Sequence, residues 1–116
     1  MSAVLKEAPQ QVYRWVTFRL ADEVYGINVM QVQEVLRMSD VAPVPGAPHF
    51  VMGIINLRGN VVTVLDTRKL LDLMPGEITE SSRIMIIESG KVTVGLLVDS
   101  VAEVVNISSA DIDPPP

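Results

Sequence analysis

Cysteine is missing from this 116-residue sequence, and histidine is nearly so. Without thiols the chain can form neither disulfides nor thiolate metal sites, and it suits a reducing compartment. His49 is the only histidine, and no nucleophile in a matching context accompanies it, so a His-based catalytic pair or a zinc site has no ligands to draw on. We therefore expect no metal, no cofactor and a cytoplasmic location.

Long apolar runs and basic clusters are also lacking. No apolar stretch approaches the roughly 20 residues that span a bilayer, and the start of the chain lacks the basic and apolar regions of a signal peptide. The nine basic residues are scattered, and the net charge is -5. These features predict a soluble protein with no direct membrane insertion and no nucleic acid partner.

What the sequence does contain is a dense apolar pattern, 48% of all residues, in one domain's length of chain. Residues 1–11 lack periodicity, and we expect a flexible lead there, followed by a domain over 12–116. Alternation from Tyr13 to Leu20 predicts a half-buried strand, and Val24 to Ile27 predicts its return. Asn28 then suits the N-cap of a helix whose apolar face would carry Val29, Val32, Val35 and Leu36.

The central feature is the stretch from Gly53 to Leu73. Two apolar runs flank Arg58-Gly59-Asn60, which is typical of a hairpin turn, and a short helix should follow Asp66. A guanidinium at the end of a buried hairpin is held in a fixed place, so Arg58 either meets a partner's carboxylate or carbonyl or forms a local ion pair. A second hairpin is expected over Arg83 to Glu88 and Lys91 to Val98, turning at Ser89-Gly90.

The chain contains an internal repeat. Gly26-Ile27, Val29, Val32 and Glu34-Val35 recur 69 positions later as Gly95-Leu96, Val98, Val101 and Glu103-Val104. The repeat predicts two similar β-rich subdomains, each with a strand running into a short helix. A counterpart of the first hairpin would begin near position 122, so we expect the second subdomain to lack its closing hairpin and helix. Exposed edges of this kind favour strand sharing or domain swapping between copies.

Three segments together resemble the CheW-like family: Y-G-I-N-V-M-Q-V-Q-E-V, P-V-P-G-A-P-H-F-V-M-G-I-I-N-L-R-G and V-G-L-L-V-D-S-V. The resemblance implies a mainly β fold of two intertwined, SH3-like, five-stranded barrels with short helices, the second barrel incomplete here. It also implies a non-enzymatic adaptor of bacterial chemotaxis, at membrane-associated receptor arrays, that links the cytoplasmic tips of chemoreceptors to the histidine kinase CheA.

The same resemblance implies two sets of site residues. The positions that match the family's receptor-binding groove are Val32, Glu34, Gly53, Asn56, Arg58, Ile84 and Met85. Kinase contact in the family uses the second subdomain, which indicates Val92, Val94 and Gly95. Packing is an equally good explanation for Val32 and Ile84, and Gly95 could matter only because a side chain would not fit.

Two other function classes compete with the adaptor. Asp66 and Asp99 each end an aliphatic strand, and V-L-D-T is similar to an aspartic protease motif, in which two carboxylates share a proton. That motif needs a glycine after D-T for its turn, but Arg68 stands there, and V-D-S at Asp99 lacks the glycine as well, so a hydrolase is the weaker alternative. A small homo-oligomeric structural module is the other, and only an adaptor should bind a receptor or kinase fragment saturably.

Overall fold

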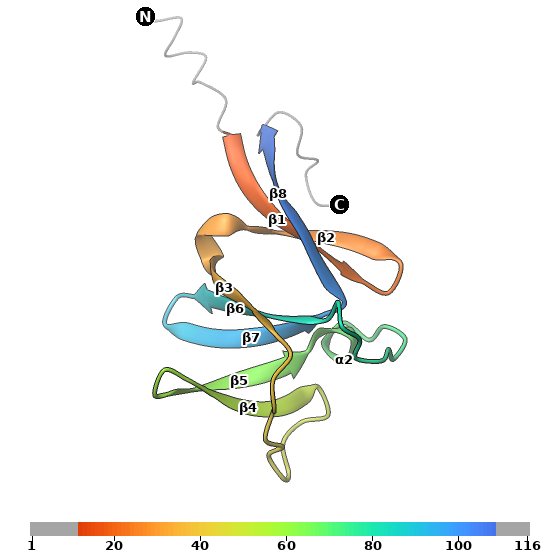
Figure 1. Ribbon diagram of the computed structural model, residues 1–116, viewed down its shortest axis with the longest axis vertical. Helices are drawn as coiled ribbons and strands as arrows, with labels where there is room; N and C mark the ends of the chain where they lie inside the picture. Colours follow the sequence, from red (N-terminus) through yellow and green to blue (C-terminus); the bar gives the residue numbers. More distant parts are fainter. Residues whose placement is uncertain (1–11, 109–116) are drawn as a thin grey trace, which may run out of the picture.

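The computed structural model describes residues 12–108 and forms two β-sheets (Figure 1). The elements in chain order are β1 (Val12–Leu20), β2 (Glu23–Asn28), the 3₁₀ turn η1 (Val29–Gln31), β3 (Val32–Arg37), β4 (Val51–Leu57), β5 (Asn60–Asp66), α2 (Thr67–Leu70), β6 (Arg83–Ser89), β7 (Val92–Val98) and β8 (Ser100–Ser108). One sheet has the order β2-β1-β8, and the other has the order β3-β6-β7-β5-β4. The expected mainly β class is confirmed.

The chain crosses between the sheets twice. It leaves the three-stranded sheet after β2, builds the five-stranded sheet from β3 to β7, and returns as β8 beside β1 (Figure 1). All pairings are antiparallel except β5 with β7, which run parallel. Segments from both ends of the described chain therefore share the three-stranded sheet, whereas the five-stranded sheet is built from the continuous stretch 32–98.

Strand β6 lies between two apolar cores because both of its faces are covered. Met85 packs with Phe18, Leu20 and Val98 in the core shared by the two sheets. Its neighbours Ile84 and Ile86 point the other way, into the core of the five-stranded sheet. A strand buried on both faces needs a continuous apolar run rather than alternation, and Ile84 to Ile87 is such a run. Each fully buried aliphatic side chain stabilises the fold by about 1.5–3 kcal/mol.

The prediction of a helix after Asn28 is wrong, because a 3₁₀ turn and then a strand occupy this stretch. Asn28 does act as an N-cap, since its Oδ1 accepts a hydrogen bond from the Met30 amide at 2.9 Å, but only one 3₁₀ turn follows. Residues Val32–Arg37 then alternate between half-buried and exposed, which is the period of a strand. Pairing with β6 satisfies their backbone, and β-branched valines suit that pairing.

Both predicted hairpins are confirmed, as β4–β5 and β6–β7. The short helix after Asp66 is also confirmed, in the form of the four-residue α2, and Asp66 caps it. The repeat holds in part: a glycine-containing strand precedes a second element twice, but that element is a strand, β3 or β8, in both copies. The expected flexible lead over 1–11 and the acidic, proline-ending segment from Asp111 lie outside the described residues.

Candidate functional site

The β4–β5 turn presents Arg58 on a rigid support. Arg58 and Gly59 have φ of 50° and 85°, the two positive angles of a type I′ turn. Asn56 stabilises the turn, because its Oδ1 accepts a hydrogen bond from the Gly59 amide at 3.0 Å. The Arg58 side chain is 69% exposed. Asn56 and Arg58, both predicted as receptor-site residues, therefore act together: the Asn56 side chain stabilises the turn, and the Arg58 guanidinium faces solvent.

Arg58 pairs with Glu34 across the edges of the five-stranded sheet. Its Nη1 donates to Glu34 Oε1 at 3.4 Å, and its Nη2 donates to Oε2. These hydrogen bonds, together with the attraction between the two opposite charges, lower the pKa of Glu34 and raise the pKa of Arg58. Of the two alternatives that the sequence allowed for Arg58, the structure contains the local ion pair, with Glu34. Exposed ion pairs add little stability, so a partner can replace either member at small cost.

A backbone bridge joins the same two sheet edges and explains Gly53. Ala42, beyond the end of β3, exchanges two hydrogen bonds of 2.9 Å with Ile54 of β4. A Cβ on Gly53 would lie 2.3 Å from the Ala42 carbonyl oxygen and 2.7 Å from Val41 Cγ1. Only glycine lets the segment after β3 lie this close to β4. Gly53 therefore fixes the position of β3, and of Glu34, relative to the Arg58 turn.

Three further predicted receptor-site residues lie inward. Ile84 and Met85 are fully buried, in different cores, and Val32 is half-buried against the core that contains Met85. With no exposed surface, Ile84 and Met85 cannot touch a partner in this conformation. They lie on β6, the strand paired beside β3, with Leu36 opposite Ile84 and Val35 opposite Met85. Their contribution to a surface is to set the position of the strand that carries Glu34.

The residues expected at a kinase contact are exposed to very different degrees. Val92 is 60% exposed, Val94 is half-buried and Gly95 is buried. A Cβ on Gly95 would lie 2.8 Å from Ile84 Cγ2 and 3.4 Å from both Ile86 Cδ1 and Val64 Cγ2. The close-packing explanation for Gly95 is thus supported by the geometry. Val92 is the one member of this set with a large accessible side chain.

A cavity of about 410 Å³ joins the Arg58 turn to the start of β7. It is lined by Gln33, Leu57, Arg58, Asn60, Val61, Val62, Lys91 and Thr93. Two cations, Arg58 and Lys91, lie at its wall, and the exposed Val61 adds apolar surface. Of the residues indicated by the resemblance, only Arg58 lines this hollow; Lys91 and Thr93, the chain neighbours of Val92, lie at its other side.

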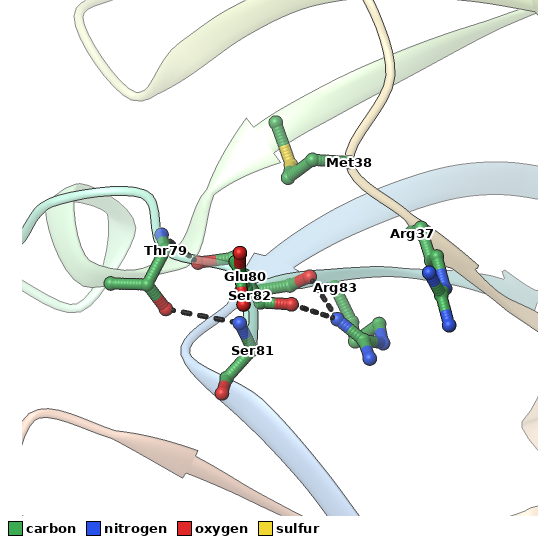
Figure 2. Close-up of a pocket in the computed structure, with 7 residues that line it drawn as sticks. All are labelled: Arg37, Met38, Thr79, Glu80, Ser81, Ser82 and Arg83. Carbon is green, nitrogen blue, oxygen red and sulfur yellow. Dashed lines mark hydrogen bonds between the residues drawn. The ribbon is translucent and has the colours of Figure 1, made fainter.

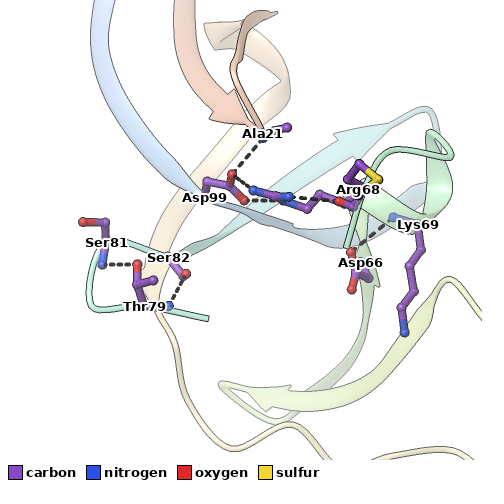
Figure 3. A network of polar contacts seen from close by, with 9 residues as sticks. Ala21, Asp66, Arg68, Lys69, Thr79, Ser81, Ser82 and Asp99 are labelled. Carbon is purple, nitrogen blue, oxygen red and sulfur yellow. Dashed lines mark hydrogen bonds and ion pairs between the residues drawn. The ribbon is translucent and has the colours of Figure 1, made fainter. Parts of the chain in front are cut away.

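The two aspartates of the hydrolase alternative take structural roles. Asp66 caps α2. Asp99 accepts hydrogen bonds from Arg68 Nε at 2.9 Å, from Arg68 Nη2, and from the Ala21 amide at 2.8 Å (Figure 3). The Arg68 guanidinium, followed by the Ala21 amide, lowers the pKa of Asp99. Both aspartates border a hollow of only about 20 Å³, which has room for one water molecule. The carboxylate of Asp99 is already hydrogen-bonded to Arg68. The arrangement does not offer two carboxylates sharing one proton.

The sequence reasoning missed the Arg68–Asp99 pair, because 31 positions separate its members. Its one signal was Arg68 in place of the glycine that a protease motif would need. Over residues 12–108, no group of three or more His, Cys, Asp or Glu side chains could hold a metal ion. None of the helices in that range is long and apolar enough to cross a membrane.

Comparison with known proteins gives consistent matches. A family model described as the CheW-like domain matches residues 14–116. The chemotaxis protein CheW of Treponema pallidum is 33% identical over 110 residues, which cover 90% of this chain and 64% of that protein. The CheW protein of Rhizobium meliloti is 36% identical over 101 residues, covering 87% and 65%. This chain thus spans slightly less than two thirds of the length of these two relatives.

A solved structure is similar as well. The crystal structure of scaffolding protein TtCheW from Thermoanaerobacter tengcongensis superposes with a TM-score of 0.88 at 38% identity. The match covers 91% of this chain and 73% of that one. At this identity and coverage, the likeness extends over both sheets and the connections between them.

Proposed function

The chain belongs to the CheW-like domain family, and from this membership we propose that it couples the cytoplasmic tips of chemoreceptors to the histidine kinase CheA in bacterial chemotaxis. It is a homologue of chemotaxis scaffolding proteins and not an enzyme. We further propose that it acts at membrane-associated receptor arrays; the two partners and this location go beyond membership of the family.

The observation that carries the proposal is the pairing of Glu34 with Arg58 on a rigid turn. We assign the receptor-facing surface to Glu34, Arg58 and the exposed part of Val32, with Asn56 holding the turn. Gly53, Ile84 and Met85 support it from within, by fixing the distance between β3 and β4 and the position of β3 on β6. A helical receptor segment would lay its apolar side chains along this surface and exchange a carboxylate or carbonyl for Glu34.

For the kinase we propose contact through the exposed Val92 at the start of β7. Val94 and Gly95 lie further along the same strand and fix its position by packing. In architecture, we assign 12–116 to one CheW-like domain made of two intertwined, SH3-like barrel subdomains. The five-stranded sheet would form one barrel, because the Ala42–Ile54 bridge joins its edge strands. The three-stranded sheet would be part of the other.

The test is an NMR titration of the ¹⁵N-labelled chain with a receptor cytoplasmic-tip fragment, beside three variants. Arg58→Asn removes the guanidinium but keeps a residue that the turn favours, Arg58→Lys keeps the charge without the planar fork, and Arg14→Gln removes an exposed charge elsewhere. We expect saturable shifts at Val32, Glu34 and Arg58 for the parent chain and Arg14→Gln. Binding should be weaker in Arg58→Lys and lost in Arg58→Asn.

Shifts of equal size in Arg58→Asn would remove Arg58 from the interface, and no shifts in a folded sample would overturn receptor coupling by this chain. A fragment of the histidine kinase CheA is added in a second titration. We expect the kinase fragment to shift the Val92 signal in the parent chain and to bind Val92→Ser more weakly or not at all.

A homo-oligomeric module is the second candidate, favoured by one feature. Within the described residues, β2 and β8 each pair with β1 only, so one edge of each strand is free to accept a strand from another copy. Sedimentation over a range of concentrations distinguishes the candidates. A stable dimer that does not bind the receptor fragment would favour the module, and a monomer that binds would favour the coupler.

A further inference from the structure

Two arginines lie directly opposite each other where β3 pairs with β6. Arg37 and Arg83 are partners in the antiparallel register, so they project from the same face of the sheet. Like charges in this arrangement repel each other. The ion pairs found among residues 12–108 are Glu34–Arg58 and Arg68–Asp99, so no carboxylate of the described chain forms an ion pair with either arginine. The repulsion therefore remains unless an anion from outside lies between them.

The loop before β6 holds one of these guanidinium groups in place. Arg83 Nη1 donates to the carbonyl oxygens of Glu80 at 2.7 Å and Ser82 at 2.8 Å. The loop is fixed in turn, because Ser82 Oγ accepts from the Thr79 amide at 2.8 Å and Thr79 Oγ1 accepts from the Ser81 amide at 3.1 Å. Ser82 is only 3% exposed. One end of the Arg83 fork is thus anchored to backbone, and its Nε and Nη2 have no acceptor in the described chain.

A cavity of about 580 Å³ lies at this point, lined by Arg37, Met38, Thr79, Glu80, Ser81, Ser82 and Arg83 (Figure 2). Figure 2 shows the two arginine side chains on the same side of the loop. The lining carries two guanidinium groups against one carboxylate, that of Glu80. This surplus of one positive charge matches a single carboxylate better than a phosphate dianion, and Met38 offers apolar contact for the methylenes of an acidic side chain.

We propose that the Arg37–Arg83 cavity binds an aspartate or glutamate side chain of an acidic segment in a partner protein. The cavity shares no lining residue with the hollow at the Arg58 turn, so this proposal does not rest on receptor or kinase coupling. Since the chain carries a net charge of -5, a local cationic site would also help to orient an acidic partner that the rest of the surface repels.

The experiment uses the whole ¹⁵N-labelled chain, titrated with a blocked hexaglutamate peptide at constant ionic strength. Matched titrations use hexaglutamine and inorganic phosphate. We expect saturable shifts of the Arg37 and Arg83 Nε–H signals and of the amides from Ser81 to Ile84, with hexaglutamate only. Shifts confined to phosphate, or equal with hexaglutamine, would overturn the proposal, and so would no shifts at all.

Variants give a second reading. Arg37→Gln should weaken hexaglutamate binding about two- to fivefold, the effect expected of one exposed charge pair, and Arg14→Gln on β1 should not change it. At low salt and without peptide, Arg37→Gln should also melt at a higher temperature than the parent chain, because the repulsion is relieved. Unchanged peptide affinity in a folded Arg37→Gln would overturn the proposal, and so would a lower melting temperature.

Discussion

The guanidinium of Arg68, in α2, binds both carboxylate oxygens of Asp99, the residue that separates β7 from β8 (Figure 3). Asp99 also accepts the Ala21 amide from the β1–β2 turn, while Arg68 Nη1 donates to the Met74 carbonyl at 2.9 Å. One carboxylate therefore connects the helix that follows β5, the crossing between the sheets, and a turn of the three-stranded sheet. The relative position of the two sheets depends on this connection.

The first prediction is that Asp99→Asn destabilises the fold. It keeps the size of the side chain but removes the charge, which leaves the half-buried Arg68 without its counter-ion. We expect the free energy of unfolding to fall by about 2 kcal/mol, the range for hydrogen bonds to charged groups. Urea unfolding followed by tryptophan fluorescence measures it. Asp72→Asn is the matched control, since Asp72 is exposed and Asn tolerates its φ of 59°. Equal losses in both variants would contradict the assigned role.

The second prediction concerns pH. The pKa of Asp99 is lowered in the folded chain from the usual aspartate value of 3.8, so the stabilisation it supplies is present above that value and lost as pH falls through the folded-state pKa. The stability difference between the parent chain and Asp99→Asn should be constant from about pH 5 to 8 and shrink below about pH 4. Unfolding curves of both proteins across this range check it. A difference that grows on acidification would show that the sign is wrong.

The third prediction is that Gly53→Ala separates the edges of the five-stranded sheet. The new Cβ would meet backbone, the Ala42 carbonyl oxygen, which cannot rotate away. We expect a loss of about 1–3 kcal/mol in the free energy of unfolding. Amide hydrogen exchange should accelerate at Ala42 and Ile54, the two residues of the bridge, more than at the β6–β7 ladder. Uniform acceleration across the domain would indicate global destabilisation instead.

The fourth prediction separates packing from contact at Gly95. Gly95→Ala would place a Cβ 2.8 Å from Ile84 Cγ2 in a full core, and should cost about 1–3 kcal/mol. In an Ile84→Ala background the same change should cost less, because the obstructing methyl is gone. Gly26→Ala is the control, since its Cβ would have no neighbour closer than 3.4 Å. If Gly95→Ala lowers the free energy of unfolding as much in the Ile84→Ala background as in the parent chain, the contact with Ile84 is not the cause.

The fifth prediction concerns the Arg58 turn in the free protein. Its φ of 50° favours Asn or Gly, so Arg58→Asn should melt at or above the temperature of the parent chain, and Arg58→Ala below it. Glu34→Gln should have little effect, since the ion pair is exposed. Thermal melting of all four proteins tests the order. A large drop in Glu34→Gln would show that the pair holds the sheet edges together.

Local patterns in the sequence were enough for the β class, both hairpins, the turn at Arg58-Gly59 and the Asp66 cap, because each depends on residues close together in the chain. The stretch from Val29 to Leu36 was misread for a physical reason. Its apolar positions have helical spacing and do not alternate as in a half-buried strand, because in the structure Glu34 takes a half-buried place and Val35 an exposed one. Pairing with β6, about 50 positions away, selected the strand.

The sequence by itself determined which residues can turn, which strands are apolar on one face or on both, and which family the chain resembles. Only the tertiary structure decided that Arg58 meets Glu34, that Ile84 and Met85 point into different cores, and that Arg37 faces Arg83. These contacts join strands that are distant in sequence. Their register follows from the joint packing of two sheets, and a one-residue slip would reverse every face.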